Sequence, residues 1–265
     1  MKGWMRVAQT EVLEHRRQPW MLTAMAAGYA LVITLVWVLL GSADSVASDP
    51  AQAAELSRQL KALGVGDGGD GATSVQSLVG LLLPSYLALL TTNMPIFVAY
   101  FAGYSMIHDR ENGVLPFVLL SPLSRGQLLL GKLLGIVAVP LGMHLVGVSL
   151  GCLPLLRLPL LEPYGALLGG GAAWWLLVLL VTPSFALFIG ALGTVVSSVA
   201  RDVRASMQIM SLCFWLLSLA FNMVVVYSVS PEGVGQLALF AVGCLAACGL
   251  TLAVGSRVMS RDLSR

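Results

Sequence analysis

The sequence predicts an all-α integral membrane protein with six transmembrane helices, an N-terminal helix in the membrane interface and a short cytoplasmic helix between the second and third spans. Apolar residues make up 57% of the chain and charged residues only 11%, whereas an ordinary globular domain carries about 25% charged residues. Six segments are long and apolar enough to cross a membrane, which needs roughly 20 such residues. The charges lie mostly between these segments, so we treat residues 1–265 as one transmembrane domain.

Residues 1–19 are charged and compatible with a helix. Trp4, Ala8 and Val12 recur at a spacing of four and therefore share one stripe of that helix. An amphipathic helix of this kind, with basic residues around its apolar stripe, lies in the membrane interface. Residues 20–40 form the first span, and their apolar run is longer than that of a secretory leader, so we expect the segment to be retained.

The largest polar loop covers residues 41–77, on the periplasmic side in the topology derived below. Asp49 is a suitable N-cap and Pro50 a suitable first helical residue. Three leucines then share one face: Leu56, Leu60 and Leu63. We therefore expect a short amphipathic helix inside this loop.

Five further spans follow this loop. They are expected at residues 78–104, 128–153, 166–198, 205–229 and 236–254. Pro84 and Pro95 lie inside the second span and Pro183 interrupts the fourth. Prolines at such positions kink or break helices.

Six spans place the two ends of the chain on the same side of the membrane. Of the 15 Lys and Arg residues, 12 fall on that side and three on the other, whereas the 13 acidic residues divide six against seven. An excess of basic residues marks the cytoplasmic side. We therefore expect both termini, the loop at 105–127 and the loop at 199–204 in the cytoplasm, and the chain in the inner membrane of a bacterium.

Several kinds of chemistry have no support in the sequence. No Asp or Glu lies well inside a span, and a carrier driven by protons or sodium normally keeps one there. The sequence has no HExxH or GxxxxGK[ST] motif, and its one GxSxG run, at residues 147–151, lies inside a predicted span instead of at the strand-to-helix turn that a serine hydrolase needs. We therefore expect a non-catalytic subunit that holds no metal or cofactor of its own, and any ATP that drives it must bind to another polypeptide.

A few polar residues fall within the spans. His144, next to Met143, is the ionisable side chain that lies deepest. A soft-metal site is one interpretation, and a neutral histidine that hydrogen-bonds between helices is the other. Four residues are candidates for a substrate path, although the same side chains would also hold helices together: Asn93, His144, Gln208 and Asn222.

The stretch 108–132 is a polar insert between two spans. Asp109 and Glu111 precede an apolar run, which suits the first turn of a helix. Phe117 lies in that run and gives it an apolar face that would fit a groove on a partner. Pro122 ends the run.

The insert then returns to the membrane through a leucine-rich segment. Arg125 and Lys132 flank the return, where we expect cations to meet lipid headgroups. Gly126 and Gly131 are expected to allow close packing at this turn.

These residues resemble the cytoplasmic coupling loop of ABC-2-type permeases, the membrane subunits of a large class of ABC transporters. That loop often shows an acidic cluster, Glu-x-Gly-Thr-Leu, an apolar helix, Ser/Thr-Pro and Arg, and a leucine run closed by Gly-Lys. The matching residues are Asp109, Glu111, Gly113, Leu115, Ser121, Pro122, Leu123, Ser124, Arg125, Leu128, Leu129, Leu130, Gly131 and Lys132. Val114 stands where Thr or Ser is usual and Pro116 where Glu is common, so the partner contact is expected to be more apolar here.

The resemblance implies a separate ATPase that binds ATP and Mg, and two permease copies for two ATPases. It implies that eight residues couple the chain to that ATPase: Asp109, Glu111, Gly113, Leu115, Phe117, Pro122, Arg125 and Lys132. The run at 122–132 looks most similar to permeases of transporters that mature nitrous oxide reductase, and also resembles permeases linked to type IV pili or gliding.

The leading functional interpretation is a permease that couples ATP hydrolysis to export or to conformational signalling across the membrane. One alternative is a membrane protein that transmits force to a periplasmic partner through the 41–77 loop without carrying a substrate. Another is a secondary transporter, which the absence of intramembrane carboxylates disfavours. Lipid is an expected contact in every case, and nucleic acid is not.

Overall fold

The computed structural model describes residues 3–16, 19–62, 71–114, 120, 122–152, 171–228 and 233–262. All regular structure within these ranges is helical, and six of the described helices are long and apolar enough to cross a membrane. The prediction of an all-α integral membrane protein with six spans is confirmed.

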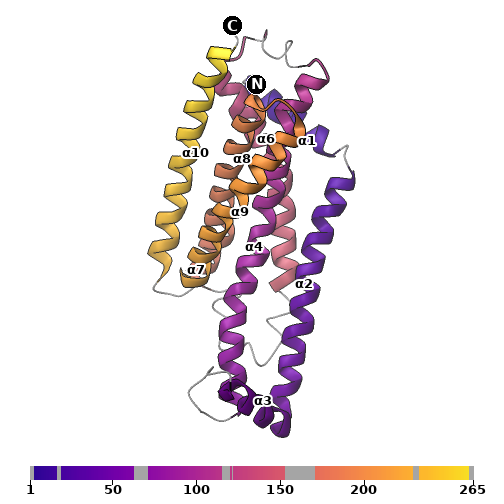
Figure 1. Cartoon of the computed structure of the whole chain (residues 1–265), viewed down its shortest axis with the longest axis vertical. Coiled ribbons are helices and arrows are strands. Elements are labelled where there is room, and N and C mark those ends of the chain that lie inside the picture. The colour runs from indigo at the N-terminus through magenta and orange to yellow at the C-terminus, as the bar shows by residue number, and fades with distance from the viewer. Residues whose placement is uncertain are drawn as a thin grey trace.

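The helices form an elongated bundle. Their bounds are α1 Gly3–Arg16, α2 Pro19–Ser48, α3 Pro50–Ala62, α4 Gly71–Glu111, α6 Arg125–Cys152, α7 Ala172–Leu176, α8 Thr182–Val199, α9 Val203–Ser228 and α10 Val234–Asp262. Figure 1 shows the two ends of the chain together at one end of the bundle, with α3 at the opposite end. The two termini therefore lie on the same side, as six spans require.

Two predicted loops are shorter than expected. The helix α2 continues to Ser48 and α4 begins at Gly71, so much of the predicted 41–77 loop is helical. The helix α4 runs on to Glu111 and α6 begins at Arg125, which shortens the predicted 105–127 loop to the connection at 112–124, called the 112–124 turn below. The short cytoplasmic helix predicted in this connection falls mostly on residues 115–119 and 121, which lie outside the described residues. The last turn of α4 contains Arg110, and a cation there is favoured by the negative end of the helix dipole.

The helix expected inside the first loop is present as α3. The carboxylate of Asp49 accepts a hydrogen bond from the backbone N–H of Ala51 at 2.9 Å, which confirms Asp49 as an N-cap. Pro50 is the first residue of α3, as predicted. The side chains of Leu56, Leu60 and Leu63 lie outside the described residues.

The fourth span is interrupted as Pro183 predicts. The short helix α7 passes into a π-helical segment, Leu177–Val181, and α8 then begins at Thr182 with Pro183 in its first turn. Proline has no N–H to donate to the preceding turn, so a change of helical register at this point avoids a missing bond. By contrast, α4 continues as a helix through Pro84 and Pro95.

Close backbone packing joins α8 to α4 in the middle of the bundle. A Cβ atom added to Gly193 would lie 2.5 Å from Cβ of Ala102, so only glycine fits there. Deeper in the bundle, the rings of Phe185 and Phe221 stack with 4.6 Å between centroids. This packing sets the position of the last turn of α4 relative to α8 and α9.

Candidate functional site

Three consecutive residues at the end of α4 contact three different parts of the bundle. His108 Nε2 lies 3.1 Å from Glu14 Oε1 of α1, and Asp109 Oδ2 lies 2.8 Å from Lys132 Nζ of α6. Arg110 Nη2 donates to the carbonyl oxygen of Ala200, just after α8, at 2.6 Å. Successive residues of a helix point about 100° apart, so one turn of α4 links three neighbours.

Lys132 is the centre of a buried ionic cluster, which we call the Lys132 cluster: Glu11, Ser105, Asp109 and Lys132. The lysine is only 2% exposed. Its ammonium group donates to Asp109 and Glu11, and to Ser105 Oγ at 3.0 Å. An ammonium group has three N–H donors, and these three acceptors are enough to occupy them.

The expectation that Lys132 meets lipid headgroups is therefore wrong. Lys132 points into the bundle, where α1 and α4 supply carboxylates that compensate for its loss of water. Hydropathy indicates how deep a residue lies along the membrane normal but not which side of its helix faces a partner. The orientation of Lys132 depends on Glu11, 121 residues away in sequence.

The helix α1 packs directly on the backbone of α6. A Cβ atom at Gly131 would lie 2.7 Å from the carbonyl oxygen of Trp4, and one at Gly135 would lie 2.8 Å from that of Ala8. Two glycines four residues apart remove the side chains that would keep the helices apart. The close packing predicted for Gly131 is thus found, whereas Gly126 has no atom near its added Cβ and does not pack closely.

The end of α4 is closed by a glycine in the left-handed conformation. Gly113 has φ of 68°, and its N–H donates to the carbonyl of Arg110 at 3.1 Å. The N–H of Val114 donates to the carbonyl of Asp109 at 2.9 Å. This is the Schellman arrangement, and it accounts for the need for glycine at position 113.

The start of α6 has a reciprocal cap. Ser124 Oγ accepts from the backbone N–H of Gln127 at 3.3 Å, and Gln127 Oε1 accepts from the N–H of Ser124 at 3.2 Å. The pair fits the Ser-x-x-Gln capping box. Both flanks of the 112–124 turn are therefore fixed by local hydrogen bonds, and Arg125 between them is half-buried.

Most of the described residues in the turn between α4 and α6 are exposed. Glu111 and Pro122 are exposed, and so are two apolar residues, Val114 at 44% and Leu120 at 82%. Apolar side chains beside charged ones form a surface suited to a protein partner. Leu115, Pro116 and Phe117 lie outside the described residues.

The acidic residues near this turn raise the question of a metal site. Carboxylate oxygens of Glu11, Glu14 and Asp109 lie within 4.8 Å of one another. Lys132 already contacts Glu11 and Asp109, and His108 contacts Glu14. The arrangement is therefore one of ion pairs between side chains.

The run Gly126–Lys132 has the GxxxxGK spacing of a phosphate-binding loop. It is followed by Leu133 instead of Ser or Thr, and it lies within the helix α6. A phosphate-binding loop needs free backbone N–H groups and an accessible lysine. A helical segment with a buried lysine provides neither.

The four candidates for a substrate path make separate hydrogen bonds or none that the structure shows. His144 shares a hydrogen bond with the Tyr29 hydroxyl at 3.1 Å, and Asn222 Oδ1 accepts one from Thr92 at 3.1 Å. Asn93 hydrogen-bonds within α4, and Gln208 is exposed on α9. His144 thus links α2 to α6, and Asn222 links α4 to α9. These contacts correspond to the helix-packing role, which is the alternative to a substrate path.

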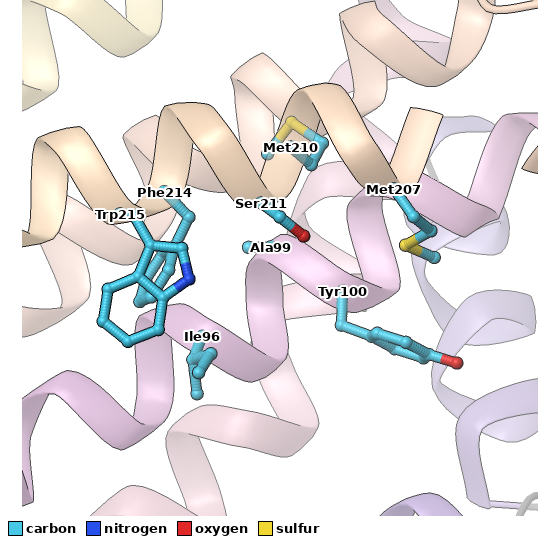
Figure 2. A pocket seen from close by; sticks show the side chains of 8 residues that line it. All are labelled: Ile96, Ala99, Tyr100, Met207, Met210, Ser211, Phe214 and Trp215. Atoms are coloured by element: carbon cyan, nitrogen blue, oxygen red, sulfur yellow. The ribbon is translucent and has the colours of Figure 1, made fainter. Parts of the chain in front are cut away.

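Two shallow hollows flank the exposed face of α4. One, of about 130 Å³, lies between α4 and α9 and is lined by Ile96 and Tyr100 of α4 and by Met207, Phe214 and Trp215 of α9 among others (Figure 2). The other, of about 310 Å³, lies between α4 and α2 and is lined by Trp20, Ile96 and Tyr100 among others. Ile96 and Tyr100 therefore form an aromatic and aliphatic ridge between the two hollows.

Five residues of the site were not predicted from the sequence: Glu11, Glu14, Ser105, His108 and Arg110. Glu11 lies seven residues after Trp4 and thus on the stripe that packs on α6, and a carboxylate on an apolar stripe was the available signal. Arg110 was counted only as a cytoplasmic charge. No pattern in the sequence indicates the role of Ser105.

One comparison with known proteins bears on this site. The family model described as ABC-2 family transporter protein matches residues 5–240, which include most of α1, the Lys132 cluster and the turn at 112–124. No curated protein matches the sequence significantly.

Proposed function

The chain belongs to the ABC-2 family of transporter membrane proteins, and from this premise we propose that it couples ATP hydrolysis on a separate ATPase subunit to movement of its own spans. The ATPase would bind ATP and Mg, and this chain would hold no cofactor. The observation that carries the proposal is the exposed turn at 112–124, which presents Val114 and Leu120 next to charged residues at one end of the bundle.

The turn is suited to such a contact because Val114 and Leu120 are exposed and both of its ends are fixed by local hydrogen bonds. Glu111, Gly113 and Pro122 are exposed. The end of α4 and the start of α6 on either side are both capped by local hydrogen bonds. A partner that displaces the turn would act on α4 and α6 together. Of the eight predicted coupling residues, Glu111, Gly113 and Pro122 are exposed. We assign the direct contact with the ATPase to these three and to Leu115 and Phe117.

Two copies of the chain would assemble with two ATPases in the bacterial inner membrane, with both termini in the cytoplasm. We propose that the ridge of Ile96 and Tyr100 faces the second copy. Both side chains are about two-fifths exposed and lie between two apolar hollows. Disulfide crosslinking of Tyr100→Cys between copies should succeed, whereas Leu239→Cys on α10 should not crosslink.

The test of the coupling function is purification of the tagged chain from its native membrane. An ATPase with a GxxxxGK[ST] motif should copurify, and Glu111→Ala and Phe117→Ala should each uncouple its hydrolysis from transport without unfolding the chain. Glu55→Ala, on α3 at the other end of the bundle, is the matched control. Absence of an ATPase would favour a secondary transporter.

A second candidate function is transmission of force to a periplasmic protein without transport. At 41 residues, α4 is about 60 Å long, or twice the apolar thickness of a bilayer. Figure 1 shows α2 and α4 extending together past the other helices to α3. If the chain transmits force, replacement of α3 by a Gly-Ser linker should abolish binding of the periplasmic partner. If the chain is an exporter, the same replacement should leave export unaffected.

A finer proposal concerns the subgroup. The run at 122–132 resembles permeases of transporters that mature nitrous oxide reductase, and short connections between the later spans are compatible with that group. Expression of this chain with its ATPase in a strain that lacks such a permease should restore nitrous oxide reduction. Failure with a stably expressed chain would remove this assignment and leave the family unchanged.

A further inference from the structure

A movement of the 112–124 turn has to pass through the ends of α4 and α6. Asp109 lies three residues before the turn and Lys132 eight residues after it, and their ion pair joins the two helices at 2.8 Å. Both residues are almost fully buried. Separation of the pair would leave each of the two buried charges without a counter-charge, which is costly. The ion pair therefore holds the two flanks of the turn at a fixed separation.

The same lysine also binds α1. Glu11 is 6% exposed and forms an ion pair with Lys132. On either side of this contact the backbone of α1 rests on Gly131 and Gly135. Without side chains on these glycines, α1 is in close contact with α6, and the ion pair resists sliding of one helix along the other.

We propose that Lys132 is a positioning residue that makes α1, the last turn of α4 and the first turns of α6 move as one body when the turn is displaced. This inference rests on the proposed function and deepens it. The ATPase pushes on the exposed turn, and the Lys132 cluster conveys that displacement to the N-terminal helix. Lys132 itself does not touch the ATPase, because it is buried behind the turn.

The cluster has a feature that distinguishes this role from simple stabilisation. A buried ion pair adds little net stability compared with well-packed apolar residues of similar size. Charges within spans nevertheless carry a cost that is usually associated with function. Neutralising every charge of the cluster at once should therefore preserve the fold while removing the link between α1 and α6.

The experiment uses the complex with its ATPase in lipid nanodiscs, with the four native cysteines replaced by alanine. Spin labels are placed at Leu13→Cys on α1 or at Gly126→Cys at the start of α6; Leu13 is exposed and an added Cβ at Gly126 meets no atom within 4 Å. Distances between the two copies are measured without nucleotide and with ATP plus vanadate. In the otherwise native chain, both distances should shift.

The neutral variant combines Glu11→Gln, Asp109→Asn and Lys132→Met. It should assemble and hydrolyse ATP, and the shift at position 126 should persist while the shift at position 13 is lost. A swapped variant, with Glu11→Lys, Lys132→Glu and Asp109→Asn, should restore the shift at position 13. An undiminished shift at position 13 in the neutral variant would overturn the inference.

The remaining outcomes also decide the matter. No nucleotide-dependent shift at position 126 in the otherwise native chain would overturn the proposed function, and this inference with it. If the neutral variant does not assemble, Glu11→Gln alone, which keeps the pair of Asp109 and Lys132, is measured in the same way and should lose the shift at position 13. If that variant also fails to assemble, the cluster serves folding and the inference is rejected.

Discussion

Asp109 and Lys132 form an ion pair across the base of the turn that joins α4 to α6, with 2.8 Å between Oδ2 and Nζ. Both charges are buried, and desolvation offsets much of their attraction. Loss of one partner alone is far more costly, because the other is left buried without a counter-charge. A single substitution in the pair should therefore cost more stability than a substitution that removes both charges.

Lys132→Ala should destabilise the protein by about 3–5 kcal/mol, since it leaves Glu11 and Asp109 buried without their cation. The triple neutral variant should recover most of this loss. Thermal unfolding in detergent measures both, with Arg204→Ala, at an exposed position of α9, as the control. Equal melting temperatures for Lys132→Ala and Arg204→Ala would contradict a buried ionic cluster.

Gly135→Ala should destabilise the contact between α1 and α6. The added methyl group would lie 2.5 Å from Cβ of Glu11 and 2.8 Å from the carbonyl oxygen of Ala8, and overpacking of this kind costs about 1–3 kcal/mol. Gly142→Ala in the same helix meets nothing within 4 Å and should be neutral or stabilising, because alanine is the better helix former. The two variants are compared by thermal unfolding, and a similar response in both would show that α1 does not rest on Gly135.

Arg110→Ala should loosen the connection between α4 and the end of α8. Arg110 donates to the carbonyl oxygens of Ala200 and Arg201, and an exposed hydrogen bond of this kind contributes about 1 kcal/mol. Arg110→Lys should retain part of the effect because lysine keeps the charge at the helix C-terminus. Arg201→Ala keeps the carbonyl and is the control; a loss of stability there as large as in Arg110→Ala would point to general charge effects.

Tyr29→Phe should destabilise the packing of α2 against α6 by about 1 kcal/mol, because it removes the hydroxyl that bonds to buried His144. Tyr100→Phe removes a hydroxyl from a residue that is 42% exposed and should have little effect. Thermal unfolding again provides the comparison. An unchanged Tyr29→Phe variant would remove the helix-packing role of His144 and return it to the candidates for a substrate path.

The spans were predictable because each depends on local composition. Twenty apolar residues in sequence have no stable alternative to a membrane helix, and the break near Pro183 follows from its missing N–H. The N-cap at Asp49 was equally local, and a carboxylate there bonds a backbone N–H two residues away. Such features need no knowledge of which helices are neighbours.

The Lys132 cluster was not predictable in this way. Lys132 has the sequence context of a residue at the membrane surface, and its burial arises only when α1 and α4 supply Glu11 and Asp109. The length of α4 was underestimated because charged residues such as Asp109 were assigned to a loop, although they continue the helix and pair with other helices. Contacts between distant segments determine both features.

The orientation of the chain can be tested by labelling engineered cysteines with a membrane-impermeant maleimide. Glu55→Cys on α3 and Gly126→Cys at the start of α6 lie at opposite ends of the bundle. Because 12 of the 15 basic residues fall on the side of Gly126, that side is predicted to be cytoplasmic. In spheroplasts Glu55→Cys should be labelled at once, and Gly126→Cys only after permeabilisation.

The unsubstituted chain, whose four cysteines lie within helices of the spans, sets the background. The reverse pattern would place the 112–124 turn away from cytoplasmic ATP and would thereby exclude a cytoplasmic ATPase as its partner.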